Sequence, residues 1–489
     1  MVFNNSILAG SSTQEEDVYE IGNSLLFNDD DSPYLQDPNS NAGDSRKKFT
    51  FSGWFKLCNL GINRYVYAYR YDDNNNAQFY FNTSDQIELF DKTGGSTQMQ
   101  LKTNRVFRDV GSWYHIVIIW DTTQSTASDR TQLYVNGQRE TSFATATYPS
   151  LNADSGGANR TASNMRIGTY AVSGSYFDGF MSELHYFDNE AFNPSSFGKT
   201  NSKGIWVPIE YEGADSTYGS NGFYFQFANS GTLGANTKGK GNYSSSGLSA
   251  TNQAPDTPTN NFTNMNILDN YPHQGVFSKG NLQIVSFQSS YHSHTSTMGL
   301  KRGKWYAEIK WTAQGSSPSG YYSNTFFGIV GSVDTTSSIG VGTRSDSYCY
   351  IGTTVGSGED GGKKRNNATS SAYGADYHVN DIIGIALDLD NNKIYWSKNG
   401  TFQNSGDPTS GSTGTGSAFD LTTPSSGFYY FAVSDQHGDS SSTWQLNFGS
   451  VPPYTISSGN ADGNGYGNFE YAVPSGYYSV CTKNISEFG

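Results

Sequence analysis

Apolar and polar residues alternate in short runs from Phe49 onward, and Gly, Asn, Asp or Ser interrupts these runs about every ten residues. Such spacing is typical of short antiparallel strands in an all-β sandwich. The run at 113–121 is apolar at odd and even positions alike, which predicts a central strand covered on both faces. The strands expected in the first half are FTFSGWFKL, YVYAYRY, AQFYFN, QIELFD, WYHIVIIWD, TQLYVNG, NMRIGTY and FDGFMSELHYFD.

The apolar density falls after Gly204, and the stretch 230–261 is rich in Gly, Ser, Thr, Asn and Pro. GFYFQFAN just before it still alternates like one strand, so the connector is expected to begin as ordered structure. Strand patterning resumes at Asn281. The clearest hairpin is predicted where IIGIALDLD and KIYWSKN flank Asn391 and Asn392, two residues that tolerate the left-handed conformations of a tight turn.

These patterns divide the chain of 489 residues into five predicted parts. Two large domains fit this length, each with its own core. The parts are an N-terminal arm (1–18), a first sandwich (19–204), a turn-rich connector (205–274), a second sandwich (275–449) and a turn-rich C-terminal tail (450–489).

The composition agrees with strands and turns: 15% of the residues are aromatic, and the chain has 55 Gly, 34 Tyr and 30 Phe. Only 15% of the residues are charged, so neutral polar groups must cover most of the surface. The net charge of -14 would repel phosphate backbones, and only the short basic run GGKKR at 361–365 stands out against it. Nucleic-acid binding is therefore not expected.

The three cysteines, Cys58, Cys349 and Cys481, stand far apart without CxxC spacing, so neither a disulfide framework nor a zinc site is expected. The first residues lack the basic start and apolar core of a secretory signal. No run of about 18 apolar residues occurs, so we expect no membrane insertion. Synthesis in a cytosol is the corresponding expectation.

Ordered motifs in each half resemble known domain families. FTFSGWFKL, WYHIVIIWD, LYVNGQRE, MRIGTY and YFDGFMSELHYFDNEAF, between Tyr19 and Phe197, resemble the laminin-G-like (concanavalin A-like lectin/glucanase) domains. GKWYAEIKW, FFGIVGS, DIIGIALDLDNNKIYWSKNGTF, FAVSD and LNFG, between Gly275 and Gly449, resemble a SPRY domain. The two resemblances imply two concanavalin A-like jelly-roll sandwiches in tandem.

The flanking segments YEIGNSLLFNDDDSPYL, GIWVPIEYEG, DTPTNNFTNMNILDN and VPSGYYSVCTKN give the chain an arrangement similar to structural or tail-fibre-like proteins of marine bacteriophages. The resemblance implies a virion protein, made in the host cytoplasm, that forms a homo-oligomer in the particle among other virion proteins and binds either host-surface carbohydrate or a neighbouring virion protein. A tail-fibre or adhesin component is the leading interpretation. A capsid-surface decoration or fibre protein and a polysaccharide depolymerase are the alternatives.

One carboxylate string matches the depolymerase alternative. Glu15, Asp17 and Glu20 have the spacing by which related β-glucanases place a nucleophile and an acid on one face of a cleft. Here the string follows the turn-rich AGSSTQ at the start of the chain instead of lying within a strand framed by aromatic residues. We therefore predict that the protein is not an enzyme and has no catalytic residues.

The acidic triplet Asp29, Asp30 and Asp31 has two interpretations. In a loop, its carboxylates could supply oxygen ligands to Ca²⁺; otherwise it is a solvated turn. Ca²⁺ is the one cofactor considered. His292 and His294 would share one face of a strand, but no third ligand lies near them in sequence, so solvent exposure is expected.

Tyrosine-rich loops are the candidate ligand-binding positions. Planar tyrosine faces stack on sugar rings, and neighbouring Asp or Asn side chains accept hydrogen bonds from sugar hydroxyls. The alternative is that these tyrosines fill half-exposed strand positions. The candidates are Tyr176, Asp178, Tyr321, Tyr322, Tyr348 and Tyr350.

Overall fold

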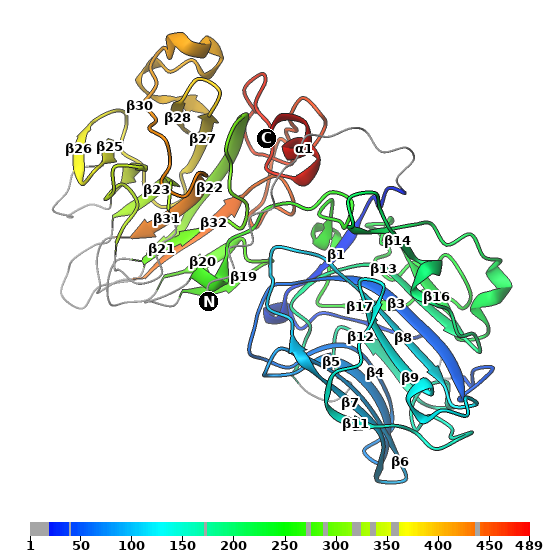
Figure 1. Ribbon diagram of the computed structural model, residues 1–489. Coiled ribbons are helices and arrows are strands. Elements are labelled where there is room, and N and C mark those ends of the chain that lie inside the picture. Colours follow the sequence, from blue (N-terminus) through cyan, green and yellow to red (C-terminus); the bar gives the residue numbers. More distant parts are fainter. Residues whose placement is uncertain are drawn as a thin grey trace. The chain divides into compact units, whose positions relative to one another are not determined.

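The computed structural model describes residues 19–38, 41–170, 174–269, 275–286, 292–314, 324–332, 339–353, 361–435 and 441–489. These residues form two compact units, with the boundary between Asn261 and Phe262. Each unit is built from antiparallel sheets, which confirms the predicted all-β class with two sandwiches in tandem (Figure 1).

The N-terminal unit contains two eight-stranded sheets. The first has the order β10 (Gln138–Arg139), β9 (Thr131–Val135), β8 (Tyr114–Asp121), β3 (Lys48–Leu57), β13 (Gly179–Asp188), β1 (Ser24–Phe27) and β18 (Gln253–Ala254), with β16 (Phe223–Phe225) paired to β13. The second has the order β11 (Phe143–Thr147), β7 (Ser96–Val106), β6 (Gln86–Thr93), β5 (Asn75–Phe81), β4 (Arg64–Asp72), β12 (Asn164–Ile167), β2 (Tyr34–Gln36) and β17 (Ser244–Ser246). A separate pair joins β14 (Gly198–Thr200) to β15 (Trp206–Pro208).

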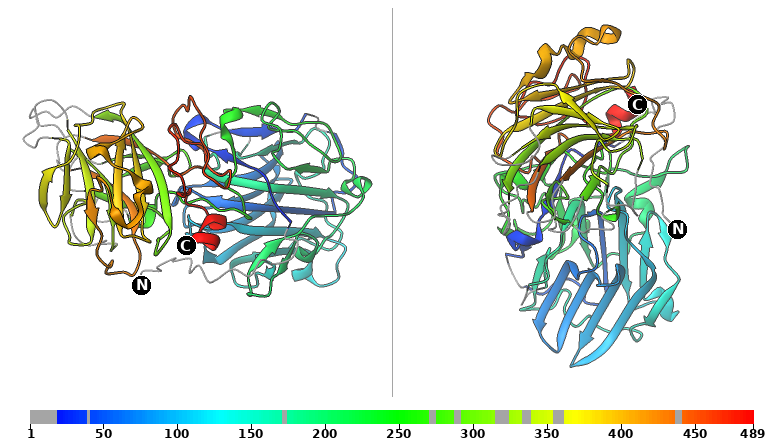
Figure 2. Two further views of the ribbon diagram at one scale, coloured as in Figure 1. Left: turned by 90° about the horizontal axis from the view of Figure 1, so that it is seen from above. Right: turned by 90° about the vertical axis from the view of Figure 1, so that its left-hand side faces the viewer.

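Aromatic side chains fill the space between these two sheets. Phe51 of β3 lies 4.8 Å, ring to ring, from Tyr67 of β4 and 6.0 Å from Phe79 of β5. All eight residues of β8 are buried, and β8 lies between β3 and β9, so the predicted central strand is confirmed. Figure 2 shows β4 to β7 (blue to cyan) as one twisted layer.

The predicted connector at 205–274 differs from the structure. Residues up to Asn261 belong to the N-terminal unit, where β16, β17 and β18 pair with β13, β2 and β1. The buried Lys56 donates to Asp256 at 2.8 Å and to Asn261 at 2.7 Å, and so ties the end of this segment to β3. Turn-rich composition does not exclude a segment from a fold when its short strands join the sheets through backbone hydrogen bonds.

The C-terminal unit also has two sheets. The eight-stranded sheet has the order β19 (Val276–Ser278), β20 (Gln283–Val285), β32 (Ser442–Asn447), β22 (Lys304–Gln314), β27 (Ile382–Asp388), β28 (Lys393–Lys398) and β29 (Thr401–Phe402), with β30 (Phe419–Asp420) paired to β28. The six-stranded sheet has the order β21 (His292–Thr295), β31 (Tyr430–Asp435), β23 (Thr325–Val330), β24 (Ser347–Gly352), β25 (Lys363–Asn366) and β26 (Thr369–Ala372). The predicted hairpin is confirmed as β27 and β28, and Asn392 adopts the left-handed conformation with φ 55°.

The C-terminal tail is turn-rich, as predicted, and it packs on this unit. Buried Glu308 of β22 accepts hydrogen bonds from Tyr454 and from the backbone amides of Glu470 and Tyr471. Val480 and Ile485 join the core of the unit. The tail ends in the helix α1 (Thr482–Phe488).

Short helices occupy several loops. They are η1 (Asp29–Asp31), η2 (Ala127–Asp129), η3 (Pro194–Ser196), η4 (Asp215–Tyr218), η5 (Ala250–Asn252), η6 (Ile267–Asp269), η7 (Gln403–Ser405) and η8 (Pro408–Thr413). Within the described ranges, no helix has the length and apolar character needed to cross a bilayer.

Candidate functional site

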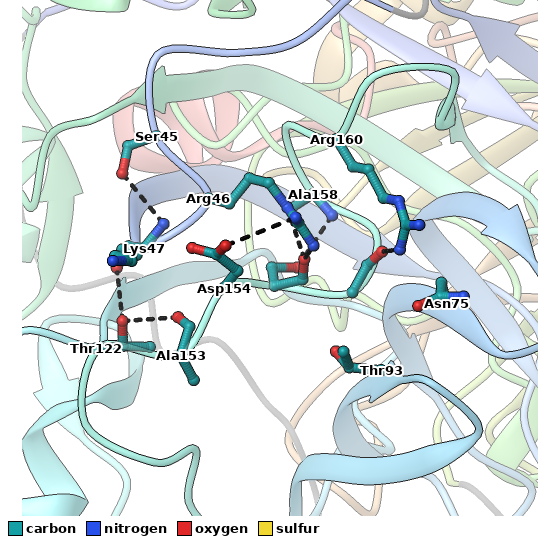
Figure 3. A network of polar contacts seen from close by, with 12 residues as sticks. Ser45, Arg46, Lys47, Asn75, Thr93, Thr122, Ala153, Asp154, Ala158 and Arg160 are labelled. Carbon is teal, nitrogen blue, oxygen red and sulfur yellow. Dashed lines mark hydrogen bonds and ion pairs between the residues drawn. The ribbon is translucent and has the colours of Figure 1, made fainter.

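An open groove of about 690 Å³ lies at one end of the N-terminal sandwich. Three separate parts of the chain line it: residues 42–47 between β2 and β3, Tyr71 at the end of β4, and residues from the β11–β12 loop, namely Asp154 and 159–162. Figure 3 shows the polar contacts around it. We call this feature the β2–β3 groove.

The first wall of the groove is held by a buried carboxylate. Asp188, at the end of β13, accepts hydrogen bonds from the backbone amides of Asp44 (2.6 Å) and Ser45 (3.1 Å) and from the side chain of Asn159 (2.7 Å). Burial raises the pKa of Asp188, while the hydrogen bonds from the backbone amides of Asp44 and Ser45 oppose this shift. One carboxylate therefore fixes both the β2–β3 segment and the opposite loop.

A second buried carboxylate holds the floor. Asp91 of β6 accepts from Ser155 Oγ at 2.6 Å and from the backbone amide of Gly156 at 3.0 Å. Burial raises its pKa to about 6, and the hydrogen bonds from Ser155 and Gly156 oppose this shift. Residues 155–159 are all buried, so the floor is part of the packed structure. The groove is preformed rather than built from loose loops.

Charged side chains line the groove. Arg46 donates through Nε to the carbonyl oxygen of Ser155 at 3.0 Å and lies 3.7 Å from a carboxylate oxygen of Asp154. The guanidinium of Arg160 lies over the ring of Tyr71, 3.9 Å from the ring centre. In Figure 3, Arg46 and Asp154 lie between Lys47 and Arg160. Burial lowers the pKa of Arg46, Asp154 raises it, and nearby Arg160 lowers it further.

The sequence pattern did not single out these residues. The signal available was the run Arg46, Lys47 and Lys48, three basic residues in an acidic chain just before a strong strand. Nothing in the local sequence connects this run with Tyr71 or Arg160, because the groove forms only when the three segments meet.

Two of the tyrosines predicted in the second half, Tyr348 and Tyr350, do not lie in an exposed loop. Tyr348 and Tyr350 belong to strand β24, in which all six residues are buried. Their rings face the core, where Tyr348 packs 5.1 Å from Phe419 and Tyr350 packs 6.1 Å from Trp396. Both side chains therefore lie in the core instead of in the exposed loops predicted for them, because both faces of the strand are covered. Tyr321 and Tyr322 lie outside the described residues.

The predicted residues of the first half lie at the opposite end of the sandwich from the groove. Tyr176 is half-buried, whereas Asp178 is buried, which differs from the solvent-facing role expected of it. Burial raises the pKa of Asp178 well above its usual range, and neighbouring Asp29 and Asp30 add to the effect while Arg64 opposes it. Asp178 Oδ1 has no hydrogen-bond partner among the described residues.

The acidic triplet forms the short helix η1, with Asn28 donating to Asp31 at 2.8 Å. The structure thus brings Asp29 and Asp30, predicted as calcium ligands, close to Asp178, predicted as a ligand-binding residue. These two predicted sites lie far apart in the sequence. No group of three or more His, Cys, Asp or Glu side chains in the described part of the chain is placed to hold a metal ion. Calcium binding stays a prediction.

The other candidates have these positions. Glu15 and Asp17 lie outside the described residues, so the structure does not test the glucanase-like spacing of Glu15, Asp17 and Glu20. His294 is buried, in contrast to the predicted exposure, because β21 joins the β31 edge of its sheet. Across the described ranges the three cysteines are buried and are not joined in disulfides.

Comparison with known protein families identifies one domain in each half of the chain. Residues 29–196 match the model of the concanavalin A-like lectin/glucanases superfamily, and residues 304–439 match the model of the SPRY domain. The ATP-dependent RNA helicase DDX1 of Xenopus laevis is 30% identical over 110 residues, which are 22% of this chain and 12% of that protein. The chain thus spans about an eighth of that relative.

Three solved structures are similar to parts of this chain at low sequence identity. The SPRY domain of human HERC1 is 13% identical, with a TM-score of 0.27, over 37% of this chain and 94% of that one. A heptameric SAP-like pentraxin from Limulus polyphemus is 15% identical, with a TM-score of 0.26, over 36% and 80%. Domain 4 of the extracellular arabinanase AbnA from Geobacillus stearothermophilus, in complex with arabinotriose, is 16% identical, with a TM-score of 0.27, over 39% and 82%. From the two family matches we conclude that the chain carries a concanavalin A-like lectin/glucanase domain followed by a SPRY domain.

Proposed function

We propose that this protein binds saccharide through the β2–β3 groove and that it acts as the adhesin or tail-fibre component of a bacteriophage particle. The groove is the observation that carries the binding role. It is open, polar and held in shape by Asp91 and Asp188, and Tyr71 at its edge is 42% exposed. A preformed polar concavity beside an accessible aromatic ring suits a sugar, which presents hydroxyl groups and an apolar ring face.

The two domain types support a binding role. A concanavalin A-like lectin domain and a SPRY domain are both matched, in this order. The phage assignment rests on the resemblance of the flanking segments to tail-fibre-like proteins. In a particle, several copies would bind one surface together, so weak single sites would give firm attachment through effective concentration.

The test is binding of the purified chain to an array of bacterial surface oligosaccharides. We expect signal from the wild type and loss of most of it in Tyr71→Ala, because the exposed ring stacks on the sugar. Tyr34→Ala is the matched control, since Tyr34 also lies under an arginine, Arg166, at 4.6 Å, but away from the groove. An empty array for the wild type, or equal loss in both variants, would contradict the groove as the binding site. For the phage role, particles lacking the protein should adsorb less to host cells.

A further inference from the structure

The charges of the β2–β3 groove are not balanced. Arg46, Lys47 and Arg160 face two carboxylates, Asp44 and Asp154. Asp154 lies beside Arg46, and Asp44 accepts hydrogen bonds from the backbone amide and the hydroxyl of Ser220 at 3.0 and 2.6 Å. Within the described parts of the chain, Lys47 and Arg160 form no ion pair. Asp72, next to Tyr71, acts electrostatically on Arg160, but it accepts hydrogen bonds from Asn74 and Asn75 at 2.8 and 2.9 Å. The groove therefore presents two cations whose donors are not taken up by an ion pair with a described carboxylate.

The position of Arg160 leaves donors available. Its guanidinium rests on the Tyr71 ring at 3.9 Å, and its one hydrogen bond among the described residues is a long contact of 3.4 Å to the carbonyl oxygen of Gly156. A guanidinium has five N–H donors in a planar fork that matches a carboxylate or sulfate group. Stacking on Tyr71 holds this fork in place and reduces the conformational entropy lost on binding.

The surroundings make this cationic site unusual for the chain. The net charge is -14, so the protein as a whole repels anions at long range. An anion that binds here must therefore be recognised at short range by these side chains. Asp44 and Asp154 at the groove, together with the exposed Tyr71, add acceptors for hydroxyl groups and a stacking face, which favour a sugar over a simple anion.

We infer that the groove selects an acidic saccharide, with the carboxylate or sulfate group of the sugar bound between Lys47 and Arg160. This inference rests on the proposed saccharide-binding function and specifies its ligand class. The anionic group accepts hydrogen bonds from Arg160 and an ionic contact from Lys47, and the sugar ring lies against Tyr71.

The experiment is calorimetric titration of the full chain with four probes: tetragalacturonate, its fully methyl-esterified form, a sulfated galactan tetrasaccharide and tetra-aspartate. We expect an acidic tetrasaccharide to bind at least about tenfold more tightly than the methyl ester, because a hydrogen bond to a charged group contributes roughly that factor or more. Raising the salt from 50 to 200 mM should weaken this binding. Whichever acidic sugar binds identifies the carboxylate or the sulfate as the recognised group.

Variants assign the effect to the groove. Arg160→Gln and Lys47→Gln should each weaken binding of the acidic saccharide by about tenfold to a hundredfold. Arg105→Gln is the matched control, because Arg105 also lies over an aromatic ring, Phe107, at 5.0 Å, but at the far end of β7. Thermal unfolding of each variant checks that the fold is intact.

Two outcomes overturn the inference. Binding of the methyl ester as tight as that of the tighter acidic tetrasaccharide would leave a saccharide-binding groove without selection for charge. Binding of tetra-aspartate as tight as that of the acidic saccharides would identify an acidic protein segment as the ligand instead. The proposed function itself fails in a different way, by an absence of binding to any saccharide, charged or neutral.

Discussion

His115 shows how one buried side chain is held in a single protonation state. Trp206 donates its indole N–H to Nδ1 of His115 at 3.0 Å, and Nε2 lies 2.9 Å from the hydroxyl of Ser52. Because the indole nitrogen can only donate, Nδ1 must be the unprotonated acceptor and Nε2 must carry the proton. Burial lowers the pKa of His115 to about 3, and His185 contributes further. His115 is thus a buried residue with both ring nitrogens in hydrogen bonds.

We predict that His115 makes the N-terminal unit less stable in mild acid. The unfolded chain takes up a proton near pH 6.5, whereas the folded chain does so only near pH 3, so stability is lost as the pH falls through this window. From pH 7 to pH 5 the residue should reduce the free energy of unfolding by about 2 kcal/mol. Urea unfolding of the wild type and of His115→Gln at both pH values measures this difference.

The control is Gln138→Asn, which changes no titratable group and lies at an exposed position of the same unit. The pH dependence of this variant should match that of the wild type. If His115→Gln keeps the full acid sensitivity, the neutral form of His115 is not the cause.

At the scale of elements, the loop between β11 and β12 decides the shape of the groove. Its central residues pack against the β4–β5–β6 part of the second sheet, where a Cβ atom at Gly157 would lie 2.6 Å from the backbone nitrogen of Ala77. At Gly156 a Cβ atom would lie 1.8 Å from the carbonyl oxygen of Lys92. The close approach of two backbones therefore requires glycine at these positions.

Gly156→Ala should displace this loop. The added methyl group meets backbone atoms that cannot rotate away, so we expect a loss of about 1–3 kcal/mol in the free energy of unfolding and much weaker saccharide binding. Gly241→Ala is the control, because a Cβ atom there meets nothing within 4 Å. Thermal unfolding and glycan binding of the two variants should differ clearly. Equal behaviour would mean that the loop adapts without cost.

At the scale of the whole molecule, the N-terminal unit needs residues beyond its family match, which ends at residue 196. Two partners of the buried Lys56, Asp256 and Asn261, come from the later segment. Strands β16, β17 and β18 also come from this segment. The compact unit is consequently larger than the motif-bearing part of the sequence.

We predict that a fragment of residues 1–261 folds and that a fragment of residues 1–204 does not. The shorter fragment leaves the Lys56 charge buried without its carboxylate, which costs about 3–5 kcal/mol, and it also loses the four strands β15 to β18. Solubility and a cooperative thermal transition distinguish the two fragments. A shorter fragment as stable as the longer one would show that residues 205–261 are an appendage.

The sequence by itself determined the features that depend on local pattern. Alternation and turn residues predicted the all-β class, the central strand β8 and the β27–β28 hairpin, because the side-chain period of a strand is a property of neighbouring residues. Ordered motifs such as FTFSGWFKL and DLDNNKIYWSKNG identified both domains, as the family matches confirm.

Only the tertiary structure decided which of these residues meet. Tyr348 and Tyr350 occur in a run that also suits an exposed loop, and they are buried because β23 and β25 flank their strand and the opposite sheet covers it. The groove joins Lys47, Tyr71 and Arg160, which are far apart in the chain and carry no shared sequence signal. Whether a side chain is buried, and which distant residues lie beside it, depends on packing between segments that are far apart in the chain. The local sequence pattern contains no information about that packing.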